Sequence, residues 1–279
     1  MSSKSRARGI SEREGKDEGK EGKQADLPAC RAASRVLVDG AWRGGRVRVL
    51  VGCEYSGRVR DAFIALGHDA VSCDLLPTES PGPHYQGDVL DIVGDGWDLA
   101  IFHPPCTYLT VAGMHWTKRG LRDPELTEMA LTFVRKLLDA PIPYVALENP
   151  VSVISSRIRK PDQIIQPYDF GHDASKATCL WLKGLPKLIQ TQHVEPRIVG
   201  GKKRWANQTD SGQNKLAPSK DRWKLRSTTY QGIAEAMAAQ WSAHIEMVLH
   251  TGKPTVEYPT GTPYPLAHGW DCSGCRWKP

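Results

Sequence analysis

Four short apolar runs between residues 47 and 147 place the strongest constraint on how this chain can fold. They cover Val47–Val51, His68–Cys73, Asp98–Phe102 and Tyr144–Leu147. Each run has the length of a buried strand, and helical or loop segments separate one run from the next. This alternation predicts an α/β fold, in which a mostly parallel, twisted sheet carries helices on both faces.

A glycine-bearing turn follows the first run, and a helix is predicted directly after it over 58–66. Strand, turn and helix in this order open many nucleotide-binding units, because small residues let a ligand approach the backbone. An ordinary strand-to-helix turn has the same pattern and stays open as the plainer interpretation. The turn consists of Gly52, Cys53, Glu54, Tyr55, Ser56 and Gly57.

Two acidic residues stand close to further strand ends. Asp74 follows the second run, about 20 residues after the glycine turn, where a carboxylate is suited to ribose hydroxyls. Asp88 follows the segment Tyr85–Gln86. Either residue could instead cap a helix or a turn, but their shared position at strand ends favours a nucleoside pocket.

The third and fourth runs lead into residues that can do covalent chemistry. His103-Pro104-Pro105-Cys106-Thr107 follows the third run, and Glu148-Asn149-Pro150 ends the fourth. Two prolines restrict the backbone, so the chain leaves the strand rigidly. A cysteine at such a position can act as a nucleophile, although most free cysteines are small buried hydrophobes. We expect the carboxylate of Glu148 to lie on a neighbouring strand.

Basic residues are concentrated between Lys183 and Arg226, where eleven Lys and Arg face only three acidic residues. Tryptophans and amide side chains interrupt this stretch, and the combination suits contacts to phosphates and bases. A solvated basic surface is the alternative. The predicted nucleic-acid contacts are Lys202, Lys203, Arg204, Trp205, Arg222 and Lys224.

Two amphipathic helices are predicted to pack on the sheet. One begins at Asp123-Pro124, with an N-cap residue and a proline in the first turn. Its predicted inward stripe is Leu126, Met129, Phe133 and Leu137. The other covers 229–249, and its predicted stripe is Ile233, Met237, Trp241, Ile245 and Val248.

Composition sets the remaining expectations. The chain has 279 residues, a net charge of +6 and seven scattered cysteines, which favours a reducing compartment. Without a membrane-spanning apolar run or a signal-peptide pattern, we expect a cytoplasmic protein with no membrane partner. Cys272 and Cys275 form half a zinc site with only His268 nearby, so no metal is predicted.

The predicted organisation is a disordered charged tail over 1–45, a catalytic core over 46–185, a basic recognition segment over 186–228, a returning helix over 229–249, and a Pro/Gly-rich tail over 250–279.

The order of glycine turn, acidic strand ends, Pro-Pro-Cys and Glu-Asn-Pro resembles the cytosine-5 DNA methyltransferase family, in particular its small phage-type members. The resemblance runs from about Val47 to Ile245. It implies a Rossmann-like S-adenosylmethionine-dependent methyltransferase fold with a reduced recognition region. It also implies that the glycine turn binds S-adenosylmethionine together with Asp74, Leu75, Asp88, Val89 and Pro104.

The resemblance further assigns catalytic roles. Cys106 would add to carbon 6 of cytosine, and its thiolate would have to be favoured by its surroundings. Glu148 would assist at ring nitrogen 3, provided that burial raises its pKa. Asn149 would order the cysteine loop. Lys176 stands where the family has Gln-x-Arg-x-Arg and would bind a phosphate or the cytosine oxygen, and Thr107 replaces the family's usual Gln.

We therefore expect a monomeric DNA cytosine-5 methyltransferase that flips its target base out of cytosine-containing DNA. One alternative keeps the chemistry but acts on a free cytidine nucleotide or on RNA, as the reduced recognition region suggests. Another alternative is a catalytically inactive DNA-binding homologue. The presence of both Cys106 and Glu148 argues against the inactive homologue, because a dead copy has no physical reason to keep both.

Overall fold

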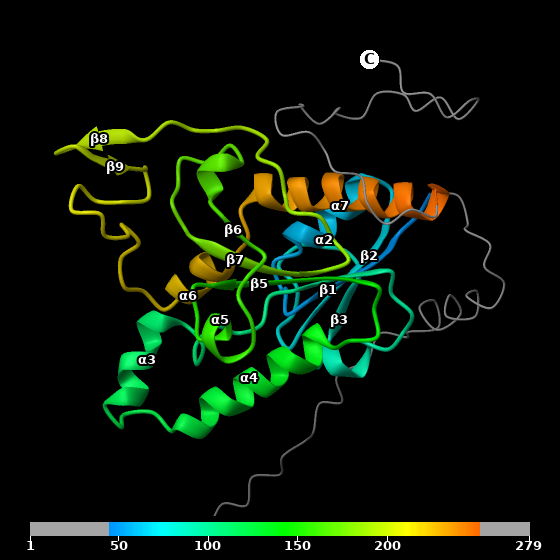
Figure 1. The fold of residues 1–279 in the computed structure, drawn as a ribbon, viewed down its shortest axis with the longest axis horizontal. Coiled ribbons are helices and arrows are strands. Elements are labelled where there is room, and N and C mark those ends of the chain that lie inside the picture. The colour runs from blue at the N-terminus through cyan, green and yellow to red at the C-terminus, as the bar shows by residue number, and fades with distance from the viewer. Residues whose placement is uncertain (1–44, 252–279) are drawn as a thin grey trace, which may run out of the picture. The chain divides into compact units, whose positions relative to one another are not determined.

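A seven-stranded sheet organises the protein, for which a computed structural model describes residues 45–251 (Figure 1). The strand order is β3-β2-β1-β4-β5-β7-β6, and β7 alone runs antiparallel to its neighbours. This mostly parallel sheet confirms the predicted α/β class. The predicted tails, including Cys272 and Cys275, lie outside the described residues apart from a few residues at their inner ends.

The predicted strands are present, with ends shifted by at most a few residues. The four apolar runs form β1, β2, β4 and β5, and β4 pairs with β5 in parallel, as the sequence suggested. Central parallel strands are covered on both faces, which is why these runs are almost continuously apolar. The bounds are β1 (Arg48–Gly52), β2 (Asp69–Asp74), β3 (His84–Gln86), β4 (Leu99–Phe102), β5 (Tyr144–Pro150), β6 (Gln163–Ile165) and β7 (Thr178–Lys183).

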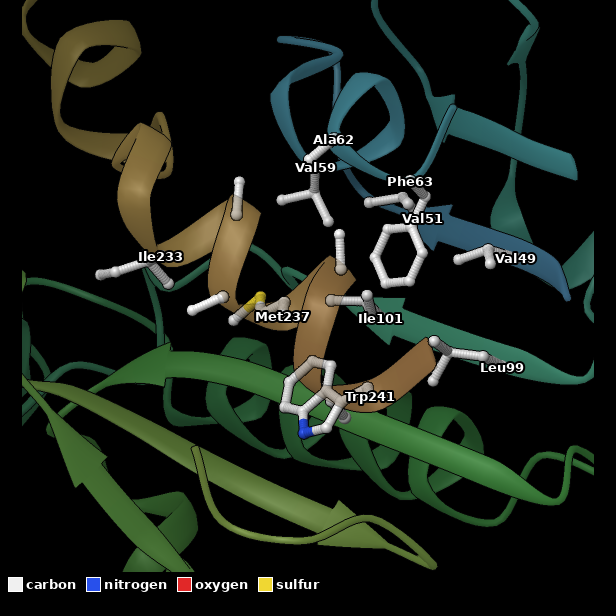
Figure 2. Packing of buried hydrophobic residues seen from close by; sticks show 14 of the residues in the cluster. Val49, Val51, Val59, Ala62, Phe63, Leu99, Ile101, Ile233, Met237 and Trp241 are labelled. Carbon is white, nitrogen blue, oxygen red and sulfur yellow. The ribbon is translucent and has the colours of Figure 1, made fainter. Parts of the chain in front are cut away.

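Helices cover both faces of the sheet (Figure 1). Helices α2 (Arg58–Ala65) and α7 (Gln231–Thr251) lie together on one face, and α4 (Pro124–Leu138) lies on the other. Figure 2 shows Met237 and Trp241 of α7 among side chains from α2, β1 and β4. Trp241 is fully buried, and its indole nitrogen donates a hydrogen bond to the Pro186 carbonyl. The predicted apolar stripe of this helix is confirmed for Ile233, Met237, Trp241 and Ile245, whereas Val248 is only half-buried.

The inward face of α4 differs from the prediction. Asp123 caps the helix by accepting a hydrogen bond from the Glu125 amide, as expected. Met129, however, is 63% exposed, so its placement in the core was wrong. Leu126 and Phe133 are only half-buried, whereas Leu137 is buried as predicted. The helix carries two overlapping apolar stripes, and the sheet is covered by Thr127, Leu131, Val134 and Leu137.

The remaining elements are short and lie mainly around the edge of the sheet where β1, β4 and β5 end. A separate hairpin, β8 (Arg197–Val199) with β9 (Lys202–Arg204), turns through Gly200 and Gly201, both of which have positive φ. That backbone suits a type I′ turn. None of the helices within residues 45–251 is long and apolar enough to cross a bilayer. The other elements are η1 (Val89–Asp91), α3 (Val111–Lys118), α5 (Ile154–Arg157), η2 (Pro167–Asp169) and α6 (Arg222–Ser227).

Candidate active site

The candidate site lies where the strand order of the sheet reverses. From β1 the chain proceeds outward to β2 on one side, and β4 then pairs on the other side of β1. In open α/β sheets, ligands bind in the crevice at the carboxyl ends of such strands. A cavity of about 100 Å³ opens at this place, lined by the turn after β1, the Pro-Pro-Cys loop after β4 and the end of β5.

The turn after β1 is strained and partly engaged in holding helix α2. Cys53 adopts a left-handed backbone with φ of 58°, which is uncommon for a residue other than glycine. The Glu54 carboxylate is buried and accepts hydrogen bonds from the Ser56 hydroxyl and the Val59 amide, both at 2.9 Å. Glu54 thus stabilises the start of α2, and the hydroxyl groups of Ser56 and Tyr55 are also engaged within the protein.

The two acidic residues at strand ends lie beside the turn but do not line the cavity. Asp74 accepts a hydrogen bond from the Leu76 amide, and Asp88 caps η1 by accepting one from Leu90. Burial raises the pKa of the Cys53 thiol, and the negative charges of Asp74 and Asp88 raise it further. Both carboxylates are therefore close enough to act on the turn.

The two neighbours of these acids have different surroundings. Leu75 is 73% exposed at the surface, whereas the side chain of Val89 is buried in the core. Val89 can therefore meet a ligand only through its backbone.

The Pro-Pro-Cys loop is tied directly to the end of β5. Asn149 is buried, and its Nδ2 donates a 2.9 Å hydrogen bond to the Pro104 carbonyl. The Cys106 carbonyl accepts hydrogen bonds from the Leu109 and Thr110 amides, which closes the loop into a turn. Cys106 is half-buried and lines the cavity together with Pro104 and Asn149.

The thiol of Cys106 is not held as a thiolate in this structure. Burial raises its pKa, the negative charge of Glu148 raises it further, and the positive charges of Lys176 and Arg226 only partly oppose this. The expectation that the surroundings favour the thiolate is therefore wrong for this state of the site. Activation of the cysteine requires a change in the charges or the water around it.

Glu148 also differs from its prediction. Burial raises its pKa, but the hydrogen bond to His103 and the positive charges of Lys176 and His103 outweigh burial, so the net pKa lies below its usual value. His103 Nδ1 lies 3.3 Å from the Oε2 atom of Glu148. Glu148 was expected to be protonated or to share a proton, but the charges of His103 and Lys176 instead favour its anionic form.

Helix α6 forms one wall of the cavity. It contacts one predicted catalytic residue and one residue of the predicted cofactor-binding turn. Lys176 Nζ donates a 2.9 Å hydrogen bond to the Arg226 carbonyl, and the Tyr55 hydroxyl bonds to Ser227 Oγ at 3.0 Å. The cavity is smaller than the roughly 300–1,000 Å³ of typical ligand sites.

The six predicted nucleic-acid contacts do not form one surface. Figure 1 shows the β8–β9 hairpin apart from α6, which carries Arg222 and Lys224. Lys202 and Lys203 are exposed on the hairpin, but the Arg204 guanidinium donates to the Asp210 and Lys203 carbonyls. Arg222 is half-buried, and Lys224 forms a 3.6 Å ion pair with Glu79.

Trp205 is the clearest correction to the predicted contact set. It is buried and stacks on Tyr168 with ring centroids 4.2 Å apart, so its face is not available to a base. Trp223 on α6 is 51% exposed and supplies the accessible aromatic ring of this segment. Burial against a distant side chain leaves no local signal in the sequence, and the basic neighbours of Trp205 masked its role.

Sequence reasoning also missed His103 and Arg226, which both line the cavity. His103 immediately precedes the two prolines and shares the strand end with Cys106, so its position was available as a signal. Arg226 could not be placed, because helix α6 meets the cavity only through the tertiary fold. Within residues 45–251, no group of three His, Cys, Asp or Glu side chains could hold a metal ion.

Comparisons with known proteins add little to this geometry. The chain matches no family model and no curated protein. One similar solved structure is described as a DNA modification methyltransferase encoded within a prophage (E. coli), with a TM-score of 0.33 and 13% identity. The match covers 49% of this chain and 46% of the other, so this chain spans about half the length of that protein. Similarity at this level carries no argument about function.

Proposed function

We propose that this protein is an S-adenosylmethionine-dependent DNA cytosine-5 methyltransferase of the small phage-type kind. The observation that carries the proposal is the meeting of Cys106, Glu148, Asn149 and Lys176 in one cavity at the switch point of the sheet. These residues come from three separate strand ends. Their order along the chain resembles that of the cytosine-5 family, and the cavity unites them with the glycine turn.

The acidic strand ends fit the proposed cofactor. The charge effect on Cys53 places the carboxylates of Asp74 and Asp88 near the turn, where they can accept hydrogen bonds from ribose hydroxyls and the adenine amino group. When bound, S-adenosylmethionine supplies an electrophilic methyl group. Gly57, which has φ of 75°, lets the chain pass from the turn into α2 in a conformation that a larger residue could adopt only with strain.

The chain's own residues account for activation of the base. The Cys106 sulfur adds to carbon 6 of cytosine, which makes carbon 5 nucleophilic and divides one difficult step into two. Asn149 holds the Pro104 carbonyl and thereby orients the cysteine loop. Lys176, once released from the Arg226 carbonyl, can bind the oxygen of cytosine or a phosphate. DNA buries carbon 6 inside the stack, so the base must leave the duplex.

A substrate comparison tests the proposal. The wild-type protein is incubated with methyl-labelled S-adenosylmethionine and with duplex DNA, single-stranded DNA, RNA or dCMP. We expect label on carbon 5 of cytosine in duplex DNA, located by bisulfite sequencing. Transfer to dCMP or RNA alone would select the alternative substrate class. Binding of DNA without transfer to any substrate would select the inactive homologue.

A further inference from the structure

His103 contacts the predicted acid and lines the same cavity as the predicted nucleophile, although the proposed mechanism assigns it no task. It follows β4 directly, its side chain is only 8% exposed, and it lines the cavity together with Cys106. Its Nδ1 atom faces Glu148 Oε2 across 3.3 Å. Because an ionised carboxylate only accepts hydrogen bonds, Nδ1 is the donor in this contact.

The second ring nitrogen of His103 has no hydrogen-bond partner within residues 45–251. Nε2 is buried and makes no hydrogen bond to any residue that the structure describes. Buried polar atoms in this state are uncommon and cost free energy, so their presence in a cavity indicates a ligand or proton-transfer role. The charge of His103 also acts on Asp74 at the end of β2.

The proposed chemistry needs a proton that Glu148 does not hold by itself. Addition of a thiolate to carbon 6 pushes an electron pair toward ring nitrogen 3, which must then take up a proton. In the free protein Glu148 is an anion, because His103 and Lys176 lower its pKa. A second group within hydrogen-bond reach must therefore supply the proton. Among the groups that act on Glu148, Lys176 is engaged by the Arg226 carbonyl, whereas His103 donates to the carboxylate itself.

We propose that His103 and Glu148 form a proton-sharing dyad, in which the imidazole supplies the proton that Glu148 places on nitrogen 3 of the target cytosine. The inference rests on the proposed function and adds to it a positioning residue that acts through Glu148. Neither the Pro-Pro-Cys nor the Glu-Asn-Pro motif contains this residue. The dyad is formed by the parallel pairing of β4 with β5.

The proton and electron balance of the step is closed. The Cys106 thiol first gives its proton to solvent, and the resulting thiolate forms a bond to carbon 6. The carbon 5–carbon 6 π pair shifts to carbon 4–carbon 5, the carbon 4–nitrogen 3 π pair moves onto nitrogen 3, and nitrogen 3 takes the proton from Glu148. The step uses His103 in its doubly protonated form, which passes its Nδ1 proton to Glu148 and becomes the neutral imidazole. After methyl transfer, carbon 5 loses its proton to solvent, the sulfur leaves carbon 6 as thiolate, and nitrogen 3 returns its proton to the dyad.

A purely structural role makes a different prediction from proton transfer. An orienting hydrogen bond to Glu148 needs only a donor near the Nδ1 position, which the amide of an asparagine can provide. An amide cannot give up a proton at neutral pH. His103→Asn therefore keeps the hydrogen bond and removes the transferable proton. His193→Asn is the matched control, because His193 Nδ1 faces the Asp169 carboxylate at 2.9 Å outside the cavity.

The kinetic experiment measures kcat and KM for DNA and S-adenosylmethionine in the wild type, H103N and H193N. We expect kcat of H103N to fall about 100-fold, the lower end of general acid–base contributions, with both KM values nearly unchanged. H193N should match the wild type. Thermal melting and calorimetric cofactor binding establish that H103N is folded. A folded H103N protein with wild-type kcat overturns the dyad.

An NMR titration tests the dyad without relying on activity. The ¹³C signal of the Glu148 carboxyl group is followed against pH in the wild type, H103N and H193N, with Glu148→Gln used for assignment. Lys176, Thr178 and Cys106 face the carboxyl group equally in the first three proteins. We expect its titration midpoint to rise in H103N, because the variant removes the charge of His103, which lowers the pKa of Glu148. An unchanged midpoint overturns the dyad. Absence of methyl transfer by the wild type would refute the proposed function alone.

Discussion

The edge of the sheet that carries Cys106 and the basic segment over 186–228 differ in how their residues are held. At the sheet edge, Cys106, Glu148 and Asn149 follow or end strands that are paired and buried on both sides. In the basic segment, a hairpin and a short helix carry exposed charges on little buried structure. Position along the chain therefore predicts proximity at the sheet edge and fails to predict it in the basic segment.

The difference shows which kind of sequence pattern predicts that residues lie close together in the folded protein. Carboxyl ends of neighbouring parallel strands must meet, whatever the loops do, so strand-end residues gather of necessity. A basic composition, by contrast, does not determine which of the basic residues lie close together. Lys202 and Lys224 come from the same charged stretch, yet one lies on the hairpin and the other on α6. The predictions below test each side of this contrast.

The largest effect is expected from Cys106→Ser at the sheet edge. A hydroxyl is a far weaker nucleophile than a thiol, so turnover should fall by about 10⁴-fold or more, as for other nucleophile deletions. Duplex DNA containing 5-fluorocytosine should trap a covalent complex with the wild type and not with C106S. Cys179→Ala, at a buried cysteine of β7, is the matched control and should still form the complex. Equal turnover by C106S would contradict the assignment of Cys106 as the nucleophile.

Two tryptophans separate structure from binding within the basic segment. Trp205→Ala should cost about 3 kcal/mol of unfolding free energy, because it removes a buried ring. Trp223→Ala should change stability by less than about 0.5 kcal/mol, since this ring is exposed. If Trp223 stacks on a base, W223A should instead weaken DNA binding by about 1–3 kcal/mol. Urea denaturation and fluorescence anisotropy measure the two effects, and a reversed pattern would contradict the assignment.

The hairpin lysines give a smaller, salt-dependent effect. Each phosphate contact contributes a slope of about −0.9 to the log–log dependence of DNA affinity on salt. Lys202→Ala combined with Lys203→Ala should flatten that slope by about 1.8, with cofactor affinity unchanged. Arg204 is left out, because its guanidinium is bonded within its own hairpin and loop. Lys136→Ala on α4 is the control, and an unchanged slope in the double variant would make the hairpin a solvated surface.

The smallest effect concerns the ionisation of Cys106. Burial and the charge of Glu148 raise its pKa, so the thiolate fraction and the rate of alkylation should increase with pH up to that raised pKa. Glu148→Gln removes the charge, lowers the pKa and should speed iodoacetamide labelling several-fold at pH 8. Peptide mass spectrometry measures the label on Cys106. Glu128→Gln, at an exposed carboxylate paired with Arg157, should leave the rate unchanged. A slower reaction in E148Q would contradict the stated electrostatics.

The parallel sheet and most of its helices could be predicted from the sequence, because each apolar run has a length and period that admit few alternatives. The α4 face shows where this reasoning stops. By sequence alone, either of its two apolar stripes could face the sheet. Only contact with β5 and its neighbours buries Leu131 and Val134 and leaves Met129 exposed. In the same way, the sequence indicates a cysteine and a carboxylate near each other but not their protonation states.

The sequence by itself determined the fold class and the strand ends that meet at the candidate site, since hydrophobic period and strand-end position are local properties of the chain. Tertiary structure alone decided which polar groups engage one another there. It placed His103 against Glu148, laid α6 over Lys176 and buried Trp205 on Tyr168. Charge, burial and hydrogen bonding depend on residues far apart in sequence, so these decisions follow only from the packed molecule.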